Sequence, residues 1–278
     1  ENKHPIIENE EFYASLEGTD SRTYVDEQIR MRWNAEDEIT IFKKSTYNRT
    51  FMFTGNTGAN AGGFRQISTD DDYWFGYDVD YSYAVYPHSA ENTLDETNLY
   101  LTVNMPAKQT YAENSFGLNA NTMVAVSDGR DGGMLQFKSA VGYLKLPLYG
   151  ENIVVKSIEL RGNDGEKLSG AATISAPYTT APSVEMAVDA SSVVTLDCGE
   201  GVTLGNDATT PTAFWFALPP VLFARGFTIV VTDNRGVTFT KSTSKVVAID
   251  RNLVLSMLSH DLRNDKNLDV EMDDKIMF

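Results

Sequence analysis

The sequence GFTIVVTDNRGVTFT, residues 226–240, carries the clearest structural signal in the chain. Two runs rich in β-branched and aromatic residues, 226–232 and 237–240, flank the turn-forming residues 233–236. Residues of the first kind pack well on a pleated surface, whereas Asp, Asn and Gly are suited to tight turns. The stretch therefore predicts a β-hairpin.

Short runs of strand length continue on both sides of this hairpin, with turn-forming residues between them. Examples are 11–16 (EFYASL), 98–105 (NLYLTVNM) and 214–218 (FWFAL). Strands at spacings of roughly 8 to 12 residues are typical of β-sandwiches. Helical periodicity is scarce, and only 249–262 offers a helix as an alternative to strands. The sequence therefore predicts an all-β fold.

The heptapeptide SDGRDGG, residues 127–133, concentrates turn formers near the middle of the chain. A chain of 278 residues is long enough for one large domain or two medium ones. We therefore expect two β-sandwich domains in tandem, the first over 1–132 and the second over 133–278, the latter with a terminal strand at 267–278. No repeat of fixed period is present, which argues against propellers and solenoids.

Charge and cysteine content narrow the function classes. The formal net charge is −16, and so acidic a chain repels nucleic acid and anionic lipid headgroups. No apolar run of about 18 residues occurs, so the sequence offers no membrane span. Cys198 is the only cysteine, which rules out an intrachain disulfide. We expect it to be a small buried or half-buried residue and not a nucleophile.

The last residues, 267–278, read NLDVEMDDKIMF and alternate between apolar and charged positions. Five apolar residues share one parity: Leu268, Val270, Met272, Ile276 and Phe278. Asp274 is the only break. This pattern predicts a strand with one buried face, which either completes its own domain or is donated to another molecule. Burying the five side chains contributes roughly 7–15 kcal/mol and ordering the segment costs about as much, so donation needs a preformed groove.

No pattern of residues predicts catalysis, a cofactor site or a metal site, and we expect a protein that is not an enzyme. The three histidines, His4, His88 and His260, show no zinc-ligand spacing. A calcium site is a less favoured alternative for one acidic cluster, because the cluster lacks the register of a calcium-binding loop. It comprises Asp70, Asp71, Asp72, Asp78 and Asp80.

Aromatic residues leave a carbohydrate-binding function open. The segment 73–87 (YWFGYDVDYSYAVYP) alternates aromatic and polar residues, and sugars bind flat against such rings, although core packing is their commoner role. A surface carbohydrate-binding module of a glycan-uptake system, with exposed aromatics near Trp74 or Trp215, is therefore the alternative function.

Four motifs in order resemble the fimbrillin-like (Mfa-like) proteins of Bacteroidales, the subunits and accessory or anchor proteins of type V pili. Three residues, Ser21, Lys138 and Tyr143, depart from the common residues of that family. The motifs are SRTYVDE…MRWNAEDEITIF (21–42), YSYAVYP (81–87), LQFKSAVGYLKLPL…VVKSIELRG (135–162) and FWFALPP…FTIVVTDNRG…VVAIDRNLVLSM (214–257).

This resemblance implies two transthyretin-like β-sandwich domains and a structural or adhesive role in a fimbria. It also implies export as a lipoprotein, display at the outer membrane, and membrane contact only through an N-terminal lipid anchor that is later removed. Family subunits assemble with other pilus subunits by β-strand donation, which makes the alternating tail a candidate donor strand. Ligands on host or bacterial surfaces are a further class of partner.

The resemblance also implies a processing step near the start of the chain. In polymerising members a protease cuts after an arginine, which removes a strand and opens the acceptor groove. Arg22 and Arg30 are the candidate processing sites here. Apart from the resemblance, the opening ENKHPIIENEE looks like an exposed tether cut from a longer precursor, either by processing or by the choice of the expressed segment.

Overall fold

The computed structural model describes residues 11–17, 31–68, 80–128 and 134–277, with the backbone alone for 11 and 271–277. The all-β prediction is confirmed: the described residues form strands and connecting turns, without a helix. The segment for which a helix was the alternative forms three short strands, β21 (Val247–Ile249), β22 (Leu253–Met257) and β23 (His260–Asp261). Within the described residues, no helix has the length and apolar character needed to cross a membrane.

The chain forms two compact units that are interleaved along the sequence. Each unit takes residues from both sides of the predicted boundary between 132 and 133, which itself lies outside the described residues and stays a prediction. Unit 1 comprises Glu1–Thr102, Met123–Lys138 and Ser175–Pro182, and unit 2 comprises Val103–Thr122, Ser139–Ile174 and Ser183–Phe278.

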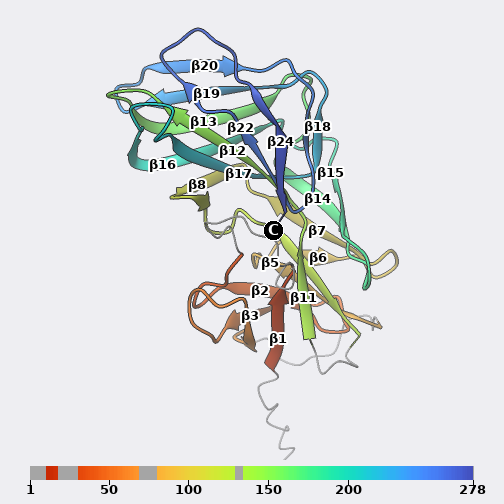
Figure 1. The fold of residues 1–278 in the computed structure, drawn as a ribbon. Helices are drawn as coiled ribbons and strands as arrows, with labels where there is room; N and C mark the ends of the chain where they lie inside the picture. Colours follow the sequence, from red (N-terminus) through yellow and green to blue (C-terminus); the bar gives the residue numbers. More distant parts are fainter. Residues whose placement is uncertain (1–10, 18–30, 69–79, 129–133, 278) are drawn as a thin grey trace, which may run out of the picture. The chain divides into compact units, whose positions relative to one another are not determined.

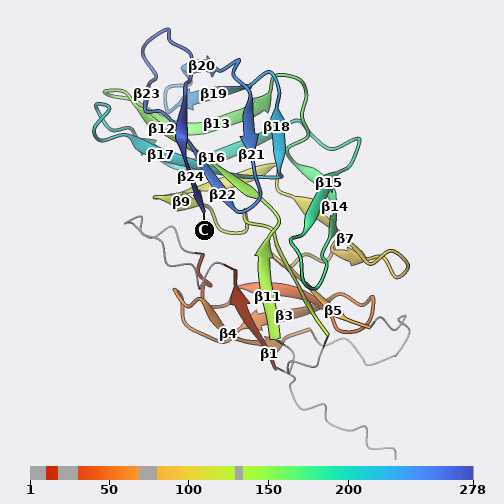
Figure 2. The ribbon, with the colours of Figure 1, turned by 45° about the vertical axis from the view of Figure 1, so that its right-hand side comes forward.

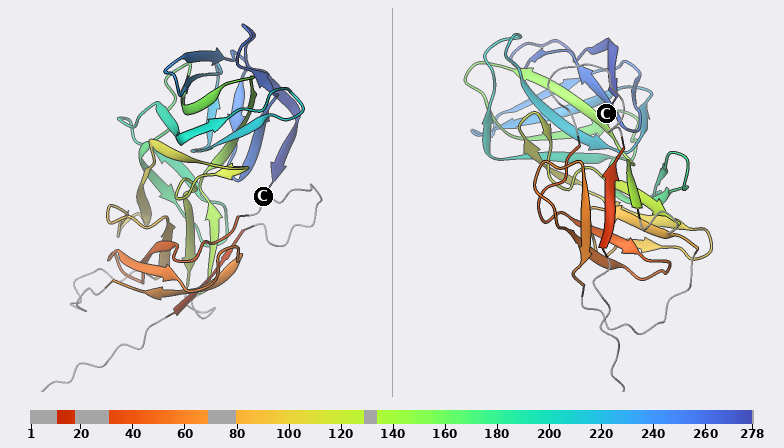
Figure 3. Two further views of the ribbon diagram at one scale, coloured as in Figure 1. Left: turned by 90° about the vertical axis from the view of Figure 1, so that its left-hand side faces the viewer. Right: turned by 60° about the horizontal axis from the view of Figure 1, so that its bottom comes forward.

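Unit 1 is a closed barrel of seven strands (Figure 3). In order around the barrel they are β1 (Glu11–Leu16), β11 (Met134–Ser139), β10 (Met123–Ser127), β5 (Ser82–Tyr86), β2 (Glu38–Phe42), β3 (Arg49–Phe53) and β4 (Ala61–Gln66). The sequence predicts a sandwich in this region; here β1 joins the edges of β11 and β4 and closes the sheet on itself.

The barrel interior is filled by aromatic rings around Trp33. Its indole lies 5.0 to 5.9 Å from the rings of Phe53, Phe64, Tyr86 and Phe137, mostly edge to face. Such pairs stabilise a core beyond the burial of their area. Because these rings come from β3, β4, β5 and β11, one cluster ties most of the barrel together.

Unit 2 is a sandwich of two sheets. The first contains β17 (Thr212–Leu218), β12 (Gly142–Tyr149), β22 and β24 (Val270–Met277) in that order, with β23 also paired to β12. The second runs β20 (Thr238–Ser242), β19 (Phe227–Asp233), β13 (Val154–Gly162), β16 (Val193–Thr203), β8 (Lys108–Ala112) and β9 (Ser115–Phe116). Alternate residues of both sheets, among them Leu146, Leu160 and Val231, form its core.

The predicted hairpin is confirmed as β19 and β20. The strands pair antiparallel from Thr228↔Ser242 to Thr232↔Thr238, around a turn in which Gly236 has a φ of 78°. The carboxylate of buried Asp233 accepts backbone hydrogen bonds from Arg235 and Val237, each of 2.8 Å. Although burial acts to raise the pKa of Asp233, these hydrogen bonds and the Arg235 side chain outweigh burial and lower it.

Five short strands complete the described chain. β6 (Thr93–Leu94) pairs with β7 (Tyr100–Met105), and β18 (Val221–Phe223) pairs with β21. β14 (Gly170–Ser175) and β15 (Ser183–Met186) are neighbours, and the loop between them contributes residues to unit 1. Cys198 on β16 is buried as predicted, and burial raises the pKa of its thiol to about 12, far from the range of a nucleophile.

Candidate functional site

The terminal strand β24 is the last strand of the first sheet of unit 2, where it runs antiparallel to β22 (Figure 1, Figure 2). Leu253 pairs with Met277 and Leu255 with Lys275, but Met257 pairs with Val270. Between these last two pairs β22 advances by two residues, whereas β24 advances by five. The ladder therefore contains a bulge on β24. Asp274, the one break in the apolar alternation, lies within this bulge.

The residues just before this bulge are built into unit 2. Leu268 is 3% exposed in the core, and its backbone N–H donates to the carbonyl of Ser242 at 2.9 Å. The carbonyl of Asp269 accepts from the N–H of Leu258 at 3.0 Å, and the Asp269 carboxylate pairs with the ammonium of Lys245. Val270 packs half-buried on the same core. The first part of the tail is therefore anchored in its own domain.

The second part of the tail is held on one side. In the described part of the chain, β22 is the only strand that pairs with β24, so the opposite edge of β24 carries no strand. An unpaired strand edge presents free N–H and C=O groups to another chain. Of the predicted donor residues, Leu268 and Val270 are placed in unit 2, Met272 and Ile276 lie on the strand, and Phe278 falls outside the described residues.

The strand β1 has the opposite situation, with partners on both edges. It runs parallel to β11, with Leu16 opposite Phe137, and antiparallel to β4, with Phe12 opposite Phe64 (Figure 2). Phe12, Ala14 and Leu16 are buried in the barrel, and the Phe12 ring stands edge-on to Phe51 at 5.4 Å. Taking β1 away would leave two unpaired edges and an open apolar channel between them.

Sequence reasoning found the strand at 11–16 but missed that it closes the barrel. A signal was present, because Phe12, Ala14 and Leu16 share one parity, yet nothing local says which strands flank them. The candidate processing residues Arg22 and Arg30 lie outside the described residues, in the segment that follows β1. Both stay predictions.

The polar clusters of the described chain have structural roles. His88 joins Thr40 and Thr50 through its two ring nitrogens, at 2.9 and 3.1 Å, and burial lowers its pKa. Tyr143 donates to Asn121 at 2.7 Å inside unit 2. Among the described residues no three His, Cys, Asp or Glu side chains gather as metal ligands, and most of the acidic cluster at 70–80 falls outside them.

The prediction of an exposed aromatic platform near Trp215 is wrong. Trp215 is 2% exposed, because β17 is covered on both faces, and its ring lies 5.5 Å from the ammonium of Lys145. FWFAL is a continuous apolar run, which is the pattern of a strand buried on both sides. Trp74, the other predicted platform residue, lies outside the described residues.

Comparison with solved structures identifies a shared all-β fold. One match is a candidate cell adhesion protein from Bacteroides ovatus, 14% identical, with a TM-score of 0.59 and coverage of 98% of both chains. Another is a candidate cell adhesion protein from Bacteroides uniformis, also 14% identical, with a TM-score of 0.51 and coverage of 96% of this chain and 97% of that one.

The tip fimbrial protein Mfa3 from Porphyromonas gingivalis, with a C-terminal truncation, is 9% identical with a TM-score of 0.37, over 94% of this chain and 98% of that one. That likeness is too weak to support an inference. No protein-family model and no curated protein matches the chain. The Bacteroides neighbours agree with the fimbrillin-like resemblance of the four motifs, and at 14% identity they establish the fold alone.

Proposed function

We propose that this protein is a cell-surface structural or adhesive component of a fimbria. The proposal is supported by the fold that it shares, over nearly its whole length, with candidate cell adhesion proteins of Bacteroides. Its partners are other pilus subunits, and its place is outside the cell, where it is exported as a lipoprotein and displayed at the outer membrane.

Assembly proceeds by exchange of strands between subunits. The observation that carries this step is the position of β1, which alone closes the barrel between β11 and β4. Cutting after Arg22 or Arg30 separates β1 from the rest of the chain. Its departure opens a channel lined where Phe12, Ala14 and Leu16 were buried, with main-chain partners ready on both sides.

The donated strand is the second part of the C-terminal tail. It is held by one neighbour through a ladder with a bulge, whereas Leu268 keeps the first part in its own core. The residues from 271 onward can therefore leave β22 without unfolding unit 2. In the open barrel the donated strand forms main-chain hydrogen bonds along both of its edges. These bonds outweigh the main-chain hydrogen bonds that it loses along its one paired edge on β22.

A peptide-exchange experiment tests this proposal. A specific protease site placed after Arg22 allows β1 to be cut in the folded protein, and a fluorescent peptide of sequence 267–278 is then added. We expect the peptide to bind the cut protein and not the intact one, because only the cut barrel has open edges. Anisotropy and size-exclusion chromatography report binding.

The matched control is the same peptide with Val270 and Ile276 both replaced by Asp, which has lost its apolar face. Equal binding of the two peptides, or no binding of either to protein that has lost β1, would contradict strand donation. A second variant that ends at Val270 keeps Leu268 in place. We expect it to fold as a monomer and to fail as a donor, and its unfolding would show instead that β24 serves its own domain.

The alternative function, a carbohydrate-binding module of a glycan-uptake system, retains one supporting observation. Its predicted Trp215 platform is buried, but unit 1 has a pocket with an exposed tyrosine on its wall. A sugar site there is compatible with an adhesive subunit as well.

A further inference from the structure

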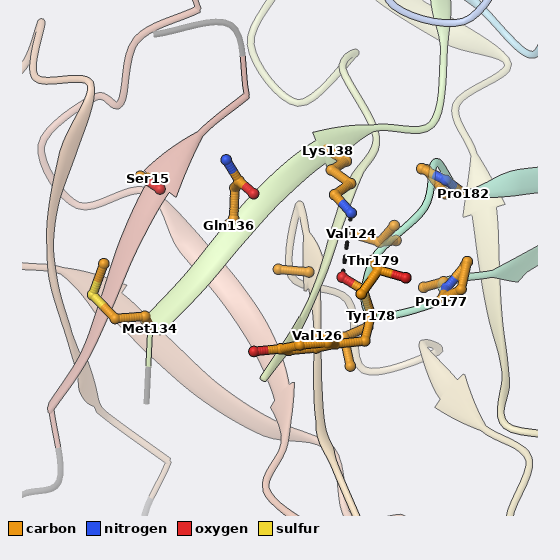
Figure 4. A pocket seen from close by; sticks show the side chains of 12 residues that line it. Ser15, Val124, Val126, Met134, Gln136, Lys138, Pro177, Tyr178, Thr179 and Pro182 are labelled. Atoms are coloured by element: carbon orange, nitrogen blue, oxygen red, sulfur yellow. Dashed lines mark hydrogen bonds between the residues drawn. The ribbon is translucent and has the colours of Figure 1, made fainter. Parts of the chain in front are cut away.

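A pocket of about 440 Å³ lies on the outer face of the unit 1 barrel (Figure 4). Leu135 and Phe137 of β11 point into the core, so Gln136 and Lys138 between and beside them face outward into the pocket. The loop 176–182 forms its wall. A volume of this size lies in the range of sites for small ligands.

Lys138 gives the pocket a fixed positive charge. Its ammonium donates to the carbonyl of Thr180 at 2.8 Å and to that of Tyr178 at 3.4 Å. An ammonium has three N–H groups, so one remains for a ligand. Neither acceptor is a carboxylate, and among the described residues no Asp or Glu lines the pocket, although the chain carries a net charge of −16. The charge is thus held in position without being neutralised, which favours an anionic group.

Tyr178 supplies an aromatic surface next to this charge. The side chain is 42% exposed, and its ring lies 5.9 Å from that of Tyr81. Figure 4 shows the ring reaching from the loop across Val126. An exposed aromatic face suits the C–H face of a sugar ring, and packing against Tyr81 reduces the cost of ordering it.

Side chains that can both donate and accept hydrogen bonds complete the pocket. Ser15 and Gln136 are opposite each other in the parallel pairing of β1 and β11. A hydroxyl and an amide can each donate and accept, which matches the hydroxyl groups at the edge of a sugar. The pocket therefore combines an aromatic wall, side chains that both donate and accept hydrogen bonds, and one cation held in position. A small number of such groups is what fixes one class of ligand in a binding site.

We propose that this pocket binds a saccharide that carries a carboxylate, such as a uronic acid, with its ring against Tyr178 and its carboxylate on Lys138. The site would give an adhesive subunit its ligand. The inference does not depend on strand donation, since the pocket lies in unit 1 of the uncut chain.

Matched sugars test the proposal with the full chain. The methyl glycosides of glucuronic and galacturonic acid differ from those of glucose and galactose only in the carboxylate. We expect calorimetry or NMR titration to show binding of at least one uronide, and about tenfold weaker binding of its neutral counterpart, the difference expected from one charge-assisted hydrogen bond.

Amino-acid substitutions then test whether the uronide binds in this pocket. Tyr178→Ala and Lys138→Met should each weaken uronide binding about tenfold. Lys138→Arg keeps the charge, and it should retain most of the affinity if the loop stays in place. Tyr100→Ala, a tyrosine of equal exposure (43%) on β7, is the control and should change nothing. Circular dichroism confirms that each variant is folded.

Three results would overturn the proposal. They are binding of neither uronide at millimolar concentration, equal binding of a uronide and its neutral counterpart, and equal effects of Tyr178→Ala and Tyr100→Ala. Loss of strand exchange in the peptide experiment would leave this result unchanged, so the two proposals fail separately.

Discussion

The two strands nearest the ends of the described chain are held in different ways. β1 has neighbours on both edges and three buried side chains, whereas β24 has one neighbour and a ladder with a bulge. Yet β1 is joined to the chain only through the segment that follows it, and β24 follows the core anchor Leu268. On the proposal made above, β1 would leave a groove once it is cut off, and the loosely paired β24, tethered at Leu268, would fill it.

The largest effect is expected from the buried face of β1. Phe12→Ala should destabilise unit 1 by about 3–5 kcal/mol, since it removes a core ring that packs on Phe51. Urea denaturation, followed by tryptophan fluorescence and by circular dichroism, measures the change. Tyr13→Ala lies on the outer face of the same strand, is 47% exposed, and should cost less than about 1 kcal/mol. Equal losses would mean that the barrel does not depend on the inward face of β1.

A smaller effect is expected from the anchor of the tail. Leu268→Ala should destabilise unit 2 by about 2–3 kcal/mol, near the low end for a buried leucine because it lies where the chain leaves the core. It should also raise hydrogen exchange along β24, since the tether loosens. Leu258→Ala is the matched control, because that side chain is 41% exposed on the neighbouring turn. Unchanged exchange in β24 would show that Leu268 does not hold the tail.

Local sequence patterns predicted where strands lie, but they did not predict which strands pair with one another. EFYASL at 11–16 and the hairpin at 226–240 could be read from residue types, because alternation and turn chemistry are local. The partners of β1 could not, since Leu135 and Phe64 are distant in sequence and many apolar strands could take their place. Parity says which face a residue occupies and not what covers that face. The burial of Trp215, in contrast, could have been predicted from the continuous apolar run FWFAL.

The pocket illustrates the same limit. Lys138 stood out in the sequence only as a departure from the family pattern, and nothing local linked it to Tyr178, 40 residues further on. The tail was closer to predictable. Its alternation gave the strand, and the break at Asp274 proved to coincide with the bulge. Only the anchoring of Leu268 required the folded structure.

The smallest effect concerns the ion pair at the base of the tail. A hydrogen bond from Lys245, with help from the backbone N–H of Val270, lowers the pKa of Asp269 below its ordinary value of 3.8. A carboxyl whose pKa is lower in the folded state adds stability above the unfolded pKa, and this contribution is lost as pH falls through the folded pKa. Lys245→Met should therefore speed hydrogen exchange in β24 slightly at neutral pH, and this effect should disappear as the pH falls through the lowered pKa of Asp269. The control is Lys108→Met, which removes a comparable exposed pair with Asp197 on the other sheet and should leave β24 unchanged at either pH. An effect of Lys245→Met that persists at low pH would assign its role to packing of the lysine side chain, and the charge would then contribute nothing to holding the tail.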